Sequence, residues 1–192
     1  MFDNFKNYLE SKITLSDHEL ELIKSVCAVK KLRKRQYLAQ EGDIWQYNAF
    51  VSSGLLKTFS IDQKGQEHIM NFSPENYWTG DRESLTTGNP SGFNILALEN
   101  SEIILIKKDD FEYICQKIPQ FYKLVNDILH KSFLASQKRI HANISLSIEE
   151  KYNDFIQQFP SIANRVPQHM IASYLGISAE TLSRIRAQAA KK

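Results

Sequence analysis

The last quarter of the chain carries three polar side chains that can form hydrogen bonds with another molecule. Glu180, Ser183 and Arg184 are spaced so that they lie on one face of a helix. Arginine can donate two hydrogen bonds to a guanine edge, glutamate can accept one from the amino group of cytosine, and serine can do either. These residues predict contacts to DNA bases, with Ala179 and Arg186 as outward-facing neighbours. The alternative is that Glu180 and Arg184 pair with each other on a solvated face.

Three more polar residues stand near the starts of the helices expected here. Gln168, Ser178 and Thr181 can bind phosphate groups through their side chains or through the free backbone N–H groups of a helix N-terminus. The net charge of the chain is only +2, but from Pro160 onward five basic residues stand against one acidic residue. Phosphate contacts would use this excess, although a solvated basic tail would give the same charge. The basic residues are Arg165, Arg184, Arg186, Lys191 and Lys192.

The elements that must position these side chains are two short helices joined by a tight turn. The stretch VPQHMIASYLGISAETLSRIRAQ places Pro167 at a helix start, Gly176 where the turn needs a positive φ, and Ser178 at the N-cap of the second helix. This order is the helix-turn-helix pattern, whose second helix enters the major groove of DNA.

Short runs rich in β-branched and aromatic residues occupy the chain from about Lys31 to Lys107, after a short helical lead-in. Turn residues such as Ser53-Gly54 and Lys64-Gly65 separate them. Many short strands at this spacing predict a sandwich, a jelly roll or a small barrel. The runs are NAFVSS, LLKTFSI, EHIMNF, FNILAL and SEIILI.

A long helix is predicted after Pro119, where apolar side chains recur at helical spacing over roughly six turns. This stripe could pack on the β-region alone. Because few other helices remain to cover it, we favour a symmetric pair of such helices as a dimer seam. A further helix is expected from Ser147 to Phe159. The stripe consists of Phe121, Leu124, Val125, Ile128, Leu129, Ser132, Phe133, Ser136 and Ile140.

Composition indicates a soluble, cytosolic protein of the α+β class. Of the 192 residues 42% are hydrophobic, yet no apolar run is long enough to span a membrane. Cys27 and Cys115 lie far apart and in no disulfide or metal motif. We expect a β-domain at residues 1–116, a dimerisation helix at 117–145 and a helix-turn-helix domain at 146–192.

The layout resembles the Crp-Fnr family of bacterial transcription regulators over nearly the whole chain. The matching stretches are EGD at 41–43, FVSSGLLKTFSIDQKGQEHIMNF at 50–72 and LGISAETLSRIR at 175–186. The resemblance implies a jelly-roll domain of the cyclic-nucleotide-binding type, a dimerisation helix and a helix-turn-helix. It also implies a homodimer on a pseudo-palindromic DNA operator, with RNA polymerase as a further partner and no membrane.

The third matching stretch implies which residues contact bases. Glu180, Ser183 and Arg184 follow the E-x-x-S-R pattern of the Fnr branch, whereas Ala179 stands where catabolite activators carry an arginine. Relatives often have a β-hairpin wing after this helix. Only residues 187–192 follow it here, so we expect no wing.

The resemblance also implies an effector pocket in the β-domain. Members that bind cyclic AMP carry G-E-L and, about ten residues on, R-S/T-A, because a buried cyclic phosphate needs a charged fork. Here Gly80-Asp81-Arg82 precedes Ser91, which stands where the arginine should be. Asp81 could bind a ribose hydroxyl, Arg82 could supply the missing charge, and Ser136 lies where relatives contact adenine. We therefore expect an unidentified effector and no cyclic AMP binding of the usual kind.

Other functions have less support in the residues. Two cysteines cannot provide the four ligands of an iron–sulfur cluster, and haem ligation would rest on His68 or His141 alone. A cupin-like metalloenzyme needs two or three histidines on one face, but His68 is the only histidine of the β-region. We expect no metal and no catalysis. A ligand-sensing adaptor whose helical tail binds protein rather than DNA remains the alternative.

Overall fold

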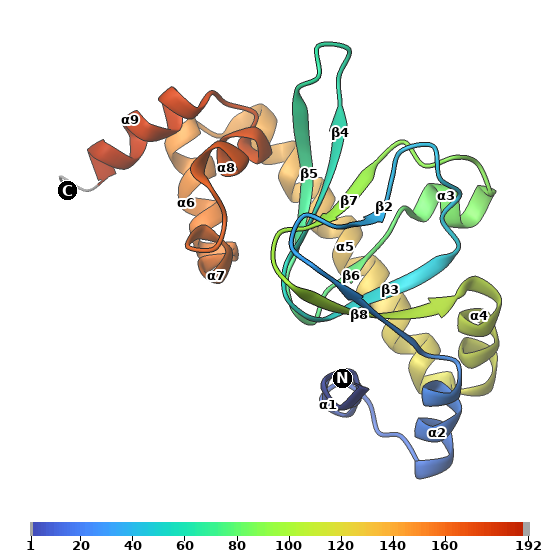
Figure 1. The fold of residues 1–192 in the computed structure, drawn as a ribbon. Coiled ribbons are helices and arrows are strands. Elements are labelled where there is room, and N and C mark those ends of the chain that lie inside the picture. Colours follow the sequence, from blue (N-terminus) through green and yellow to red (C-terminus); the bar gives the residue numbers. More distant parts are fainter. Residues whose placement is uncertain (1, 190–192) are drawn as a thin grey trace.

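The computed structural model describes residues 2–189, and Figure 1 shows three parts that follow one another along the chain. A β-sandwich with short helices leads into one long helix, α5 (Pro119–Ser145), which passes behind the sandwich in this view and ends at a group of smaller helices. The expected α+β class is confirmed. Within residues 2–189, no helix combines the length and apolar character that a membrane span requires.

The sandwich consists of two four-stranded sheets, with strand orders β1-β8-β3-β6 and β2-β7-β4-β5. All the paired strands are antiparallel, and the pairs β1·β8, β2·β7, β3·β6 and β4·β5 are nested within one another. This nesting is the jelly-roll topology that the sequence predicts. The strands are β1 (Ala28–Leu32), β2 (Tyr37–Ala39), β3 (Tyr47–Ser53), β4 (Leu56–Ile61), β5 (Glu67–Ser73), β6 (Trp78–Thr79), β7 (Asn94–Ala97) and β8 (Ser101–Lys107).

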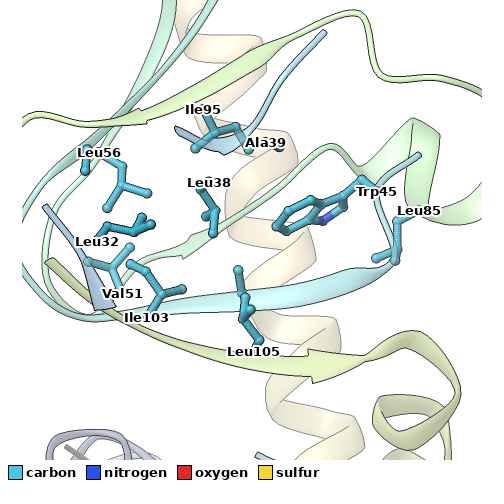
Figure 2. Close-up of a cluster of buried hydrophobic side chains, with 12 residues drawn as sticks. Leu32, Leu38, Ala39, Trp45, Val51, Leu56, Leu85, Ile95, Ile103 and Leu105 are labelled. Atoms are coloured by element: carbon cyan, nitrogen blue, oxygen red, sulfur yellow. The ribbon is translucent and has the colours of Figure 1, made fainter. Parts of the chain in front are cut away.

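Aliphatic side chains from both sheets form the core of the sandwich (Figure 2). Val51 of β3 and Ile103 of β8 stand opposite each other in one sheet, and Ile95 of β7 joins them from the other. All three are fully buried. Burial of such a side chain contributes about 1.5–3 kcal/mol each, which makes this cluster the main support of the jelly roll.

Four short helices accompany the sandwich. Ser16 begins α2 with a capping box in which Glu19 is the reciprocal partner, and Phe5 of α1 packs on Phe50 of β3 at a ring-centroid distance of 4.7 Å. Five elements were not predicted from the sequence. They are α3, β1, β2 and β6 here and the helix Pro160–Ala163 in the C-terminal part, and each is too short to show a clear period. The helices are α1 (Phe2–Glu10), α2 (Asp17–Ser25), α3 (Arg82–Thr87) and α4 (Lys108–Lys117).

The long helix α5 is buried at its start and exposed further along. Pro119 occupies its first turn, as expected. Phe121 is fully buried in a cluster that includes side chains of α1, α2 and α4. Farther along, Phe133 is 59% exposed, Ile140 60% and Ile144 81%. The apolar stripe therefore continues past the surface that this chain itself can cover.

Four helices form the C-terminal part, and their apolar sides pack on the edge strand β5. The ring of Phe72 lies 6.3 Å from Phe155 and 5.6 Å from Tyr174 between ring centroids. Ser147 caps α6 with a reciprocal capping box to Glu150, which confirms the start expected there. The helices are α6 (Ile148–Gln158), α7 (Pro160–Ala163), α8 (Gln168–Leu175) and α9 (Ala179–Ala189).

Polar contacts hold the C-terminal helices against the sandwich as well. Arg165, between α7 and α8, donates hydrogen bonds to the carboxylates of Glu75 and Glu99, two loop residues of the sandwich, at 2.8–2.9 Å. The hydroxyl of Ser173 in α8 accepts from the backbone N–H of Ile69 at 3.0 Å. The free edge of β5 is thus occupied by α8, so the two parts form one docked arrangement.

Candidate nucleic-acid interface and ligand pocket

The turn between α8 and α9 has the geometry that a helix-turn-helix requires. Gly176 adopts a φ of +70°, and its N–H donates to the last carbonyls of α8, which ends the helix. At the start of α9, the Ser178 hydroxyl accepts from the backbone N–H of Thr181 at 3.2 Å. Glycine at the turn and serine at the N-cap therefore have the local roles that their positions in the sequence predict.

The second helix, α9, separates an inward apolar face from an outward polar face. Leu182 and Ile185 are buried, and Leu182 packs in one cluster with α8 and α6. The outward residues are all exposed: Ala179, Glu180, Ser183, Arg184 and Arg186. The packing of the inward face thus presents the predicted base-contacting set to solvent.

Glu180 and Arg184 do not form an ion pair in the part of the chain that the structure describes. Hydrogen bonds from the backbone N–H of Glu180 itself and from Ser178 lower the pKa of the Glu180 carboxyl instead. The Glu180 carboxyl and the Arg184 guanidinium are both exposed to solvent. This is not the pairing that the alternative interpretation required.

The three residues proposed for phosphate contacts differ in accessibility. Ser178 is exposed and Thr181 is half-buried beside it. Gln168 is the first residue of α8, but its side-chain oxygen is buried and has no hydrogen-bond partner among the described residues. Because a phosphate accepts hydrogen bonds, a contact at Gln168 would use its backbone N–H or its side-chain NH2 group, not this oxygen. Lys191 and Lys192, expected to add positive charge, lie outside the described residues.

A cavity of about 420 Å³ opens beside the N-terminus of α3. Of the residues proposed for an effector pocket, Gly80, Asp81 and Arg82 line this cavity, whereas Ser91 and Ser136 do not. Ser136 is exposed on α5, where its hydroxyl donates to a backbone carbonyl one turn earlier. Ser132, the residue whose carbonyl it bonds, lines the cavity instead.

The hydroxyl of Ser91 is hydrogen-bonded to a neighbouring carboxylate. Its hydroxyl donates to Oδ2 of Asp81 at 2.7 Å, and both residues are buried. The other oxygen, Oδ1, accepts from the backbone N–H of Ser84 at 3.1 Å and so caps α3. Asp81 and Ser91 thus satisfy each other internally, and neither offers the cationic fork that a cyclic phosphate needs.

The described residues hold no group of three or more histidine, cysteine or acidic side chains that could bind a metal. His68 is paired with Asp62 at 3.0 Å on the exposed end of β5. Burial raises the pKa of Cys27 to about 12 and that of Cys115 to about 11, so both thiols are protonated and poorly nucleophilic at neutral pH.

The aromatic side chains of the pocket were not identified from the sequence. Trp45, Tyr47, Trp78 and Phe93 line the cavity from three separate segments. Their spacing in the sequence follows no short motif, because the jelly-roll pairing alone brings them together. A count of aromatic residues in the β-region is the only signal that could have indicated them.

Comparison with known proteins agrees with this fold. Residues 29–118 match the family model described as the cyclic nucleotide-binding domain. The regulatory protein HlyX of Actinobacillus pleuropneumoniae is 27% identical, over 90% of this chain and 76% of that protein. The fumarate nitrate reduction regulatory protein of Klebsiella oxytoca is 25% identical, over 90% and 73%.

Solved structures show the same architecture. FixK2 from Bradyrhizobium japonicum superposes with a TM-score of 0.74 at 17% identity, over 86% of this chain and 85% of that one. The jelly roll, the long helix and the helix-turn-helix together define a transcription regulator. In sequence and in architecture the chain is similar to regulators of the Crp-Fnr family.

Proposed function

We propose that this regulator binds DNA sequence-specifically through α9, with Glu180, Ser183 and Arg184 as the residues that contact bases. The observation that carries the proposal is the exposed polar face of α9, whose opposite face is anchored in the apolar cluster of the C-terminal helices. Ser178 and Thr181, together with the backbone N–H of Gln168, supply phosphate contacts at the N-termini of α9 and α8.

The protein acts as a homodimer in this proposal, with α5 as the seam. The exposed apolar side chains in the second half of α5 would be covered by the same helix of a second copy. Two recognition helices related by a two-fold axis fit half-sites about 34 Å apart, one turn of DNA, and hence a pseudo-palindromic operator. The parts are a sensor domain at 1–116, the seam at 117–145 and the DNA-binding domain at 146–192.

The cavity beside α3 is the proposed effector site. Ser132 places α5 on its wall, so a ligand that favours one position of α5 would shift the placement of the two DNA-binding domains. The Asp81–Ser91 bond argues against a cyclic phosphate in this cavity. RNA polymerase and DNA are the further partners, the protein works in the cytoplasm, and its role is regulatory rather than enzymatic.

Selection from random double-stranded DNA with the purified full chain tests this function. We expect enrichment of one sequence with two-fold symmetry, whose half-site centres are about 10 base pairs apart. Binding to the selected DNA should weaken steeply with salt, because phosphate contacts release counterions. Failure to enrich any sequence, with the protein folded, would favour the adaptor function instead.

A further inference from the structure

Four aromatic side chains line the cavity beside α3. Trp45, Tyr47, Trp78 and Phe93 contribute rings, and Trp45 lies between the aliphatic core and Leu85 in Figure 2. A cavity of about 420 Å³ is within the range of small-molecule sites, which are typically apolar with a few directed polar groups. Aromatic walls favour a flat ring system, because rings gain from stacked or edge-to-face contact beyond their buried area.

The polar groups of the cavity are mostly neutral. Thr58 of β4 and Asn71 of β5 stand opposite each other in the strand register, and both line the cavity. Asn48 and Thr79 add another amide and another hydroxyl. Such groups donate and accept hydrogen bonds without a net charge, so they suit carbonyl, ether or ring-nitrogen atoms of a ligand.

The charged groups of the lining disfavour an anion. They comprise two carboxylates, Asp81 and Glu83, and one guanidinium, Arg82. Arg82 and Glu83 are exposed at the first turn of α3, where solvent screens them. Asp81 is buried and already occupies the N-terminal N–H group that would otherwise attract an anion. A phosphate or carboxylate would therefore meet a buried carboxylate rather than a free donor.

Two buried donors in the lining have no partner among the described residues, the indole nitrogens of Trp45 and Trp78. The indole nitrogen of Trp45 has no hydrogen-bond acceptor among the described residues, and the side chain is only 6% exposed. This nitrogen lies against Gly80: a Cβ added to Gly80 would be 2.6 Å from it. An unsatisfied buried donor destabilises the fold, and a ligand atom that accepts its hydrogen bond would remove this cost. The nitrogen is fully buried against Gly80, so a ligand atom reaches it only when binding shifts the Trp45 ring or the Gly80 backbone.

We propose that the effector of this regulator is an uncharged aromatic compound that carries a hydrogen-bond acceptor for the indole N–H of Trp45. The ring system lies among the aromatic walls, and Thr58 and Asn71 bind its remaining polar atoms. This inference rests on the proposed function only in naming the ligand an effector, because the binding itself requires no DNA.

A matched pair of probes tests the charge and the acceptor together. Coumarin is uncharged and carries a carbonyl acceptor, and coumarin-3-carboxylate has the same rings with a negative charge. Each is titrated into the ¹⁵N-labelled full chain while the indole N–H signal of Trp45 is followed by NMR. The chain has two tryptophans, so the variant Trp78→Phe assigns the signal. We expect coumarin to move the signal downfield and to bind at least tenfold more tightly than its carboxylate.

Two threonine variants locate the binding. Thr58→Met fills the cavity and should weaken coumarin binding at least tenfold, whereas Thr86→Met, on the exposed side of α3, should leave it unchanged. If Thr58→Met does not fold, Asn71→Met replaces it. Equal binding of the carboxylate, displacement of coumarin by cyclic AMP, no binding of coumarin at millimolar concentration, or equal binding to both threonine variants would overturn the proposal.

DNA binding is measured on the same samples by fluorescence anisotropy with the selected operator. Coumarin binding without DNA binding would contradict the proposed function and leave the pocket assignment intact. DNA binding without coumarin binding would contradict the pocket assignment and leave the proposed function intact.

Discussion

Individual side chains on α9 divide between those that hold the helix and those that can read DNA. Leu182 and Ile185 face the cluster of α6 and α8, and Glu180 and Arg184 face solvent on the same helix. This division was predictable from the sequence, because helical spacing alone assigns each residue to a face. The effect of Ser178 on the pKa of the Glu180 carboxyl was not predictable, because it depends on the rotamers at the N-terminus of α9.

Replacing the Arg184 guanidinium should weaken specific binding selectively. We expect Arg184→Ala to cost about 1–3 kcal/mol on the selected operator, because a bidentate contact to guanine is lost. Affinity for unrelated DNA should change little. Fluorescence anisotropy with both DNAs checks this, and Arg33→Ala, an exposed arginine of the sensor domain, is the control. Equal losses on both DNAs would make Arg184 a phosphate contact.

The Ser91 hydroxyl should contribute to folding rather than to ligand binding. Ser91→Ala leaves one oxygen of the buried Asp81 carboxylate without its donor, so we expect a loss of about 1.5–3 kcal/mol in the free energy of unfolding. The matched control Ser136→Ala removes an exposed helical hydroxyl and should change stability by less than about 0.5 kcal/mol. Urea unfolding measures both variants, and equal stabilities would show that the Asp81–Ser91 bond is not structural.

Among the elements, α5 carries one apolar stripe that is buried against the sandwich at its start and exposed farther along. Its stripe begins against the sandwich at Phe121 and continues to Ile140 and Ile144, which nothing in the described chain covers. The sequence predicted the helix and its apolar stripe, but not the point at which burial ends. That point depends on the size of the β-sandwich, which short-range patterns do not encode.

A charge in the exposed half of α5 should separate the proposed dimer. Ile140→Glu places a carboxylate in the seam. Because the interface is symmetric, each subunit contributes one such carboxylate. Because each lost apolar contact is worth about 1.5–3 kcal/mol, the dissociation constant of the dimer should rise by more than about tenfold. Sedimentation equilibrium measures it, with Tyr113→Glu on the exposed face of α4 as the control. Unchanged association of Ile140→Glu would place the interface elsewhere.

The strand β5 connects the proposed pocket to the DNA-binding domain. Met70 lines the cavity, and its carbonyl accepts a hydrogen bond from the guanidinium of Arg139 in α5. The same guanidinium lies 4.2 Å from the ring centroid of Tyr174 in α8 and donates to the Tyr174 carbonyl at 3.3 Å. A ligand that moves Met70 therefore acts on a residue that also holds α8.

For the whole molecule, the docking of the DNA-binding domain depends on contacts between distant parts of the sequence. Arg165 meets Glu75 across 90 residues and Glu99 across 66. Alternating apolar and polar residues indicate strands, and capping residues indicate helix ends, because both signals lie within a few neighbouring residues. No local pattern indicates which loop carboxylates a loop arginine will meet, so this contact could not be predicted.

Removal of the Arg165 side chain should loosen this docking. We expect Arg165→Ala to speed hydrogen exchange at the backbone N–H of Ile69, which Ser173 of α8 protects, by about tenfold, equivalent to about 1.4 kcal/mol. The exchange rates of buried β8 amides should not change. Arg33→Ala again serves as the control, and no change at Ile69 would mean that the apolar cluster alone holds the domain.

Acid should have a related effect. The hydrogen bond from Arg165 lowers the pKa of the Glu75 carboxyl from its ordinary value of 4.5. The contribution of this carboxylate is therefore fully present above pH 4.5 and is lost as the pH falls through its lowered pKa. Protection of Ile69 should fall in that acidic range in the wild type and depend less on pH in Arg165→Ala. An identical pH dependence in both proteins would exclude Glu75 as the cause.

Hydroxyl-radical footprinting of the selected operator tests directly whether this protein reads DNA as a symmetric dimer. The predicted result is two protected half-sites on one face of the duplex, with centres about one helical turn apart, and their loss in Ile140→Glu at concentrations that saturate the wild type. A single protected patch without two-fold symmetry, unchanged in Ile140→Glu, would contradict it.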